Sequence, residues 1–179
     1  MVPGMKNCTV LMLAALFAGF AAAASAQSFP GSSAWTLGAR YHSEVTVPPE
    51  VHYAKGDTSY LFGYRYTESQ ISWHLAAEYA PNVGVSNNVD YAVTPQINLL
   101  FADSVFLFGA GALMSYVQDP ERDDKWSAVY FHLMAGLELP LGQRWSLAAL
   151  AEFPFKKSRD FKEFDLQHVD VLGMVSYRF

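Results

Sequence analysis

The polar residues that could do chemistry are few, and the clearest group falls in one short segment. Ser72, His74 and Glu78 recur at even spacing within residues 70–79, and Glu152 is a candidate to face them. A serine, a histidine and a carboxylate are the residue types of a nucleophile, its base and the group that orients the base. On a strand, however, same-face residues two positions apart lie about 7 Å apart, too far for a direct Ser–His hydrogen bond. An enzyme is therefore the minor alternative.

Metal-ligating residues are scattered along the chain. The histidines fall in five separate segments, without close His, Asp or Glu ligand spacing: His42, His52, His74, His132 and His168. The acidic segment 119–124 offers oxygen ligands of the kind that Ca²⁺ prefers, but Arg122 interrupts it and no EF-hand glycine follows. We expect this segment to be a solvated loop, and we expect neither a metal nor a cofactor.

Residues 1–26 have the features of a cleaved secretory signal peptide. Lys6 precedes an apolar run over 10–24, and Ala24-Ser25-Ala26 forms a small-x-small cleavage pattern. An uncleaved membrane anchor is the alternative, but the apolar run is short and no stop-transfer pattern follows it. The expected mature domain is 27–179. Since the only cysteine, Cys8, lies in the leader, a disulfide scaffold is excluded.

The composition narrows the class of protein further. Only 16% of the 179 residues are charged, against about a quarter in average soluble domains, while 15% are aromatic and 51% hydrophobic. So many apolar residues need burial, which excludes a disordered chain. The formal net charge is −5 and no basic stretch is longer than Lys156-Lys157, so no nucleic-acid partner is expected.

Apolar and polar residues alternate with a period of two in eight runs, which is the pattern of strands with two different faces. The runs cover 35–43, 59–67, 70–79, 89–101, 104–116, 127–139, 144–155 and 167–179. Their lengths of 9 to 13 residues exceed the mode of about 5 to 6 for soluble strands. They suit tilted transmembrane strands, which need about 9 to 11 residues.

The connections between these runs alternate in length. Those after the second, fourth and sixth runs are short, whereas those after the first, third, fifth and seventh are long and carry most of the prolines and charges. Outer-membrane barrels have short periplasmic turns and long extracellular loops. The sequence thus predicts an all-β fold, an eight-stranded antiparallel up-and-down transmembrane β-barrel with both termini on the periplasmic side.

The two faces of the runs indicate which one meets lipid. Lysine is absent from all eight runs, and the polar face combines small residues with charges that we expect to pair in a narrow lumen: Arg40, Arg65, Glu78, Glu138, Glu152 and Arg178. The other face carries aromatic residues near strand ends, as in the aromatic girdles of membrane barrels: Trp35, Tyr41, Tyr66, Tyr79, Trp145, Tyr177 and Phe179. A soluble lipocalin-like barrel, with the aromatic face inside, is the alternative.

The ending Val175-Ser176-Tyr177-Arg178-Phe179 resembles the assembly signal of Gram-negative outer-membrane proteins. With weaker local similarities in Gly63-Tyr64-Arg65-Tyr66 and Phe108-Gly109-Ala110-Gly111, the chain resembles small eight-stranded barrels of the OmpA-transmembrane-domain and OmpX type. The resemblance implies an outer-membrane location, and an encounter with the barrel assembly machinery through Tyr177 and Phe179. It also implies a monomer with a structural or surface role.

The long loops are where binding would occur, because loops on a rigid scaffold carry recognition. One basic patch, made of Lys156, Lys157, Arg159 and Lys162, could meet lipopolysaccharide phosphates. We therefore expect a non-enzymatic outer-membrane barrel whose extracellular loops contact lipopolysaccharide or external partners. The alternatives are a narrow pore and a lipid-modifying barrel enzyme of the lipid A acyl hydrolase kind.

Overall fold

The computed structural model describes residues 31–43, 53–54, 56–83, 89–118, 125–155 and 169–179. Within these ranges all regular structure is β-strand, and no helix is long and apolar enough to cross a membrane. The expected signal peptide at 1–26 and the basic residues Lys156, Lys157, Arg159 and Lys162 lie outside the described residues. The strands are β1 (Ser32–Tyr41), β2 (Thr58–Glu68), β3 (Ile71–Val83), β4 (Val89–Asp103), β5 (Phe106–Leu113), β6 (Tyr116–Gln118), β7 (Lys125–Trp126), β8 (Tyr130–Pro140), β9 (Trp145–Phe155) and β10 (Asp170–Arg178).

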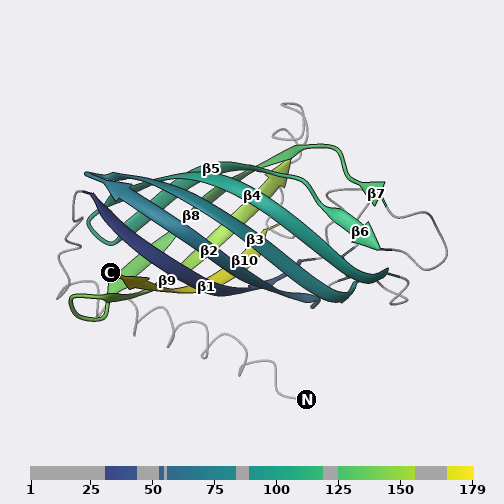
Figure 1. The fold of residues 1–179 in the computed structure, drawn as a ribbon, viewed down its shortest axis with the longest axis horizontal. Coiled ribbons are helices and arrows are strands. Elements are labelled where there is room, and N and C mark those ends of the chain that lie inside the picture. Colours follow the sequence, from purple (N-terminus) through teal and green to yellow (C-terminus); the bar gives the residue numbers. More distant parts are fainter. Residues whose placement is uncertain (1–30, 44–52, 55, 84–88, 119–124, 156–168) are drawn as a thin grey trace, which may run out of the picture.

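The strands form one antiparallel sheet that closes on itself (Figure 1). Eight long strands follow one another around the barrel in chain order, and the pairing of β1 with β10 completes the circle. The short strands β6 and β7 continue the wall beyond β5 and β8 and pair with each other. The predicted eight-stranded antiparallel barrel is therefore confirmed. The run predicted over 104–116 is interrupted after Leu113, and β6 begins at its last residue. The run predicted over 127–139 begins only at Tyr130, and the short strand β7 precedes it.

The two ends of the barrel differ in their connections. At the end that carries Phe179, here called the C-terminal end, turns of two residues join β2 to β3 and β4 to β5, and four residues join β8 to β9. Ser69 and Ser104 adopt positive φ angles of 58° and 60° in the two shortest turns, as tight hairpins of right-twisted strands require. All longer connections lie at the opposite end, here called the loop end.

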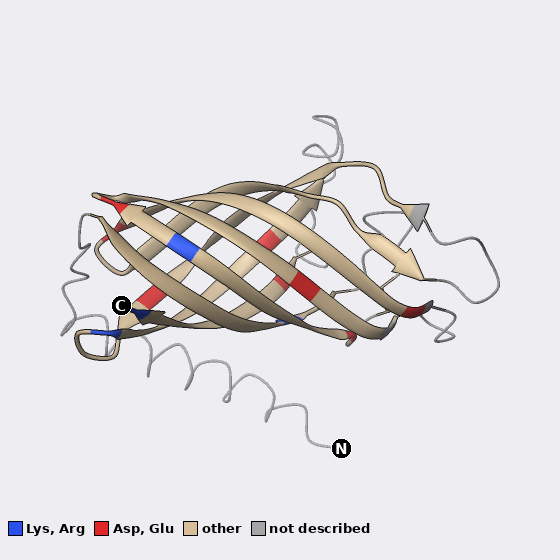
Figure 2. Cartoon of the chain, viewed as in Figure 1, with Lys and Arg blue, Asp and Glu red and all other residues tan. Residues whose placement is uncertain are grey.

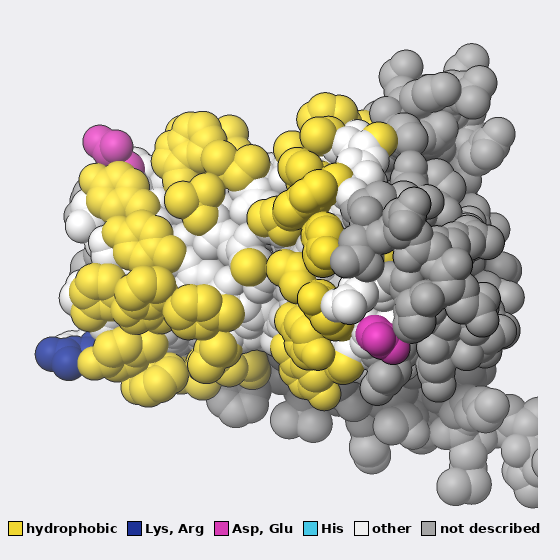
Figure 3. Space-filling view, turned by 45° about the vertical axis from the view of Figure 1, so that its right-hand side comes forward, with side chains coloured by type: hydrophobic (Ala, Val, Ile, Leu, Met, Phe, Trp, Pro, Cys, Tyr) yellow, Lys and Arg dark blue, Asp and Glu magenta, His cyan; other side chains and the backbone are white. Residues whose placement is uncertain are grey.

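The outer surface of the barrel is apolar. On the face shown in Figure 3, hydrophobic side chains cover the wall in two bands, and charged side chains appear only toward the ends. Six of the seven aromatic residues predicted for the girdles are classed as exposed, while Tyr177 is intermediate. Trp35 stacks on Phe62 with ring centroids 5.4 Å apart, and the ring centroids of Trp145 and Tyr177 lie 4.8 Å apart. This surface suits lipid rather than water.

The interior contains an apolar cluster that the sequence analysis did not anticipate. Inward positions expected to be polar or small also carry large apolar side chains, which pack together across the lumen: Leu61, Leu100, Leu107, Met134, Leu150, Leu172 and Met174. Eight strands leave an interior just wide enough to be filled by side chains. Leucine and methionine fill it as well as paired charges do, and they need no polar partner.

Candidate functional site: polar clusters inside the barrel

Arg40 is the centre of the larger polar cluster. Its Nη1 atom lies 2.8 Å from Glu78 Oε2, and its Nη2 atom lies 2.5 Å from Glu152 Oε2. The three residues come from β1, β3 and β9, and all three side chains are buried. The charged positions of the strands stand apart along the wall (Figure 2), yet the side chains of Arg40, Glu78 and Glu152 meet inside the barrel. Buried side chains remain charged when a group of opposite charge lies beside them, as in this cluster.

His42 extends this cluster toward the loop end, just beyond the end of β1. Its Nδ1 atom lies 3.0 Å from Asp170 Oδ2, and its Nε2 atom lies 2.9 Å from the hydroxyl of Ser59. Ser59 in turn donates a hydrogen bond to Glu78. Tyr53 stacks on the imidazole at a centroid distance of 3.7 Å, with both rings buried. Tyr53 therefore covers the cluster from the loop side.

The charge state of His42 follows from these neighbours. Burial disfavours the imidazolium form, but hydrogen bonds to Asp170 and Glu78 and their negative charges outweigh burial, so the pKa of His42 is raised above 6.5. A protonated His42 donates from both ring nitrogens, which matches its contacts with Asp170 and Ser59. If His42 were uncharged, the guanidinium of Arg40 alone would balance the negative charges of three carboxylates, those of Glu78, Glu152 and Asp170.

A second cluster closes the C-terminal end of the lumen. Arg65 donates two hydrogen bonds to Glu138, at 2.9 and 2.5 Å, in the fork geometry that suits a carboxylate. Ser146 donates a third to the same carboxylate at 2.5 Å, and Arg178 Nη2 lies 4.0 Å from it. These residues belong to β2, β8, β9 and β10, so the contacts tie opposite walls of the barrel together.

Further polar side chains connect the walls between these clusters. His74 Nε2 lies 2.9 Å from the hydroxyl of Thr36, and Asn98 donates to the other ring nitrogen of His74 at 3.3 Å. His132 Nε2 donates to the Asn98 carbonyl at 2.8 Å. Gly111 makes room for this group, because a Cβ at that position would collide with Asn98 and His132.

The serine, histidine and glutamate singled out from the sequence do not come together as a catalytic group. Ser72 shares a hydrogen bond of 2.9 Å with Thr67, and His74 pairs with Thr36. Glu78 contacts Arg40 instead. The wide spacing of same-face strand residues explains this outcome.

The structure does assemble a different Ser–His–Asp set, which sequence reasoning missed. Ser59, His42 and Asp170 come from three separate segments, and only the pairing of β1 with β2 and of β1 with β10 brings them together. Their two contacts have the lengths of a catalytic triad. However, Ser59 has no exposed surface, and its hydroxyl donates its proton to Glu78 rather than to His42.

Little space remains around these groups. A cavity of about 10 Å³ lies among Arg40, His42, Tyr53 and Glu152, which is room for roughly one water molecule. The part of the chain that the structure describes contains no group of three His, Cys, Asp or Glu residues able to hold a metal ion. The arrangement is chemically a buried ion-pair network.

The residues of the expected assembly signal lie at the outer rim of the C-terminal end. The amide of Phe179 donates to the carbonyl of Ser33 at 3.1 Å, which attaches the last residue to β1. Arg144 donates to the Tyr177 hydroxyl at 3.1 Å. Phe179 is 64% exposed, so its ring faces outward.

Comparison with known proteins gives a likeness of fold. No protein-family model and no curated protein sequence matches the chain. Among solved structures, Neisserial surface protein A (NspA) is similar with a TM-score of 0.54 at 12% identity, over 83% of this chain and 97% of that protein.

Two other structures match less closely. A de novo designed transmembrane β-barrel has a TM-score of 0.48 at 10% identity, covering 84% of this chain and 98% of its own. Ail, the attachment invasion locus protein of Yersinia pestis, solved with the heparin analogue sucrose octasulfate, has a TM-score of 0.39 at 16% identity, covering 84% and 100%. The closed sheet and the likeness to NspA show that the chain has the fold of the small eight-stranded outer-membrane β-barrels, as the sequence resemblance implied.

Proposed function

We propose that this chain is a non-enzymatic outer-membrane barrel whose filled lumen makes it a rigid scaffold for its long loops. One observation carries the proposal: the outer wall is apolar, while polar clusters and a layer of leucine and methionine fill the interior. A barrel with this distribution is stable in a bilayer and offers ions no path through its centre. Its surface-interaction role then belongs to the loops.

The orientation follows the rule for outer-membrane barrels, in which short turns face the periplasm. The C-terminal end, with Tyr177 and Phe179, would meet the barrel assembly machinery, and the protein would be a monomer. At the loop end, Lys156, Lys157, Arg159 and Lys162 would contact lipopolysaccharide phosphates, since clustered cations attract anionic groups. Export would use the signal peptide at 1–26.

The decisive experiment is to refold residues 27–179 in detergent, to verify the barrel by its changed mobility in SDS gels on boiling, and to record conductance in planar bilayers. We expect a heat-dependent shift and no stepwise conductance. Steady single-channel currents from the folded form would overturn the sealed scaffold and favour the narrow pore. A protein that stays soluble without detergent and shows no shift would overturn the membrane placement itself.

The lipid-modifying alternative has a specific observation to test, the Ser59–His42–Asp170 set. The folded protein is incubated with vesicles containing lipid A and phospholipid, and the lipids are analysed by mass spectrometry. We expect no loss of acyl chains, because Ser59 is inaccessible. Acyl-chain loss that disappears in Ser59→Ala, with folding retained, would show that the set is catalytic.

A further inference from the structure

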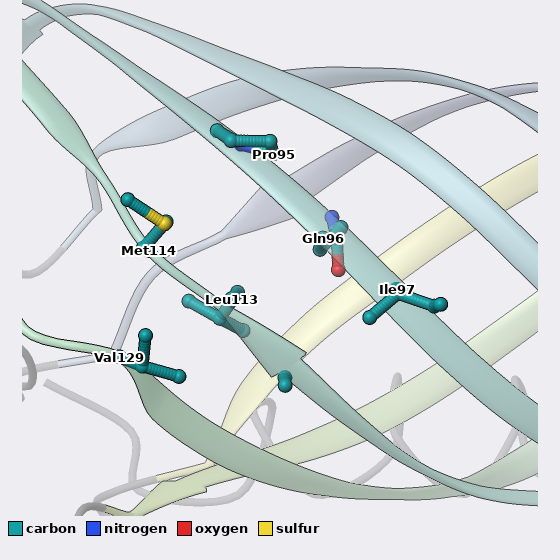
Figure 4. A pocket seen from close by; sticks show the side chains of 7 residues that line it. Pro95, Gln96, Ile97, Leu113, Met114 and Val129 are labelled. Carbon is teal, nitrogen blue, oxygen red and sulfur yellow. The ribbon is translucent and has the colours of Figure 1, made fainter.

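A large recess lies in the outer wall of the barrel, beside the interruption of β5. It measures about 360 Å³, within the range of roughly 300 to 1,000 Å³ typical of ligand pockets. Figure 4 shows it between β4 on one side and the ends of β5 and β8 on the other. The lining is almost wholly apolar: Pro95, Gln96, Ile97, Ala112, Leu113, Met114 and Val129.

A break in strand pairing produces the recess. Leu113 pairs with Tyr130, and Tyr116 pairs with Trp126. Three residues, 127–129, therefore oppose only Met114 and Ser115, and this bulge turns Val129 outward, where it is 52% exposed. On the facing strand, β4 pairs with β5 up to Gln96 and with β6 from Val93, so Pro95 lies at the gap.

The two sides of this break have opposite character. Toward the lumen, the hydroxyl of Ser115 lies 2.7 Å from that of Thr94 and 2.9 Å from that of Tyr130. The amide of Ser115 donates to the Ser127 hydroxyl at 2.8 Å. These hydrogen bonds satisfy the interrupted backbone from within. They leave the outer side apolar and hollow.

Leu113 forms the floor of the recess. Its side chain is 4% exposed, and it also lines the small cavity beside Arg40 and His42. One leucine thus stands between the lipid-facing recess and the charged cluster. The floor offers a ligand hydrocarbon contacts and closes the wall behind them.

We propose that the recess holds one hydrocarbon chain of a bilayer lipid, an inference that rests on the proposed membrane placement. The recess is continuous with the apolar outer surface, since Ile97 and Val129 belong to both. A hollow lined by apolar atoms gains dispersion contacts only when hydrocarbon fills it. An acyl chain is the flexible apolar group that surrounds this wall, and its shape fits a furrow between two strands.

The test uses the full mature barrel in vesicles of phosphatidylethanolamine and phosphatidylglycerol that contain a trace of phospholipid with a diazirine on one acyl chain. After illumination, adducts are mapped by peptide mass spectrometry. Leu37 and Val171, on the opposite wall, provide the reference because they are 62% and 52% exposed, at least as much as Ile97 at 45%. Random contact with lipid predicts no more labelling at the recess than at this reference.

Two matched variants complete the design. Ala112→Phe places a ring in the recess, whereas Ala110→Phe places the same ring two residues away on the same face of β5. We expect several-fold enrichment of adducts at Ile97, Met114 and Val129. Ala112→Phe should reduce the labelling of the recess to the reference level, and Ala110→Phe should leave this labelling unchanged.

The outcomes separate the two proposals. A barrel that inserts and changes its gel mobility on boiling could still be labelled evenly around the wall. That result would overturn the lipid-chain site and leave the proposed scaffold role intact. Equal effects of the two phenylalanine variants would overturn it as well. A chain that does not insert would refute the membrane placement, and the recess proposal with it.

Discussion

Arg40 and Glu152 lie 2.5 Å apart between β1 and β9, two strands that do not pair with each other. The contact therefore reaches past β10, the strand that lies between them in the sheet. Because Arg40 also contacts Glu78 on β3, a single guanidinium joins three strands from inside. This bond pattern makes the interior a structural element of the barrel and predicts what removal of its members would do.

Arg40→Met leaves Glu78 and Glu152 buried without their cation. Removal of one partner of a buried ion pair costs about 3–5 kcal/mol, so we expect a loss of that order in the free energy of unfolding. The measurement is urea unfolding in detergent micelles, followed by the gel shift. The triple variant with Glu78→Gln and Glu152→Gln is the control, and it should recover much of the loss. Equal stability of the single variant and the natural chain would contradict the role of Arg40.

Gly111→Ala tests the packing of the polar group formed by His74, Asn98 and His132. The added Cβ would collide with Asn98 and His132, so we expect a loss of about 1–3 kcal/mol in unfolding free energy. Gly173→Ala is the matched control on β10, because the nearest atom to its Cβ, the carbonyl oxygen of Ala39, is 4.0 Å away. The same unfolding assay compares the two. A similar effect of both alanines would indicate loss of glycine flexibility rather than a collision.

The raised pKa of His42 makes stability depend on pH. The stabilisation from its contacts with Asp170 and Glu78 is fully present below the unfolded-state pKa of about 6.5 and is lost as the pH rises through the higher folded-state pKa. Urea midpoints should therefore fall as the pH rises above about 6.5. His42→Gln should flatten this dependence. If the slope persists in that variant, another group is responsible.

The basic loop residues can be tested together. Replacement of Lys156, Lys157, Arg159 and Lys162 by glutamine should weaken the binding of folded barrel to lipopolysaccharide-coated surfaces, and most strongly at low salt, because salt screens exposed charges. Surface plasmon resonance at two salt concentrations measures the effect. Arg144→Gln, at the C-terminal end, serves as the control for a changed surface charge. Unaltered binding by the fourfold variant would remove the lipopolysaccharide contact.

Three properties of the barrel could be predicted from the sequence: its eight long strands, the two faces of each strand and the apolar outer wall. A period of two assigns each residue of a strand to one of two sides, so Trp35, Tyr41 and Tyr79 could be placed outside without coordinates. Short and long connections alternate regularly along the chain, so the end of the barrel at which each strand begins could be predicted. These properties are local, and composition and spacing record them directly.

Which side chains meet inside the barrel depends on how the strands are arranged in three dimensions. The side chains that meet across a lumen depend on the tilt of the strands and on the shift of each strand relative to its neighbours. The alternation within one strand predicts neither of these. For this reason His42, Ser59 and Asp170 became neighbours, whereas Ser72 and His74 did not. The same limit hid the layer around Leu61 and Leu107 and the break at Met114, because both arise where strands from distant parts of the chain adapt to one another.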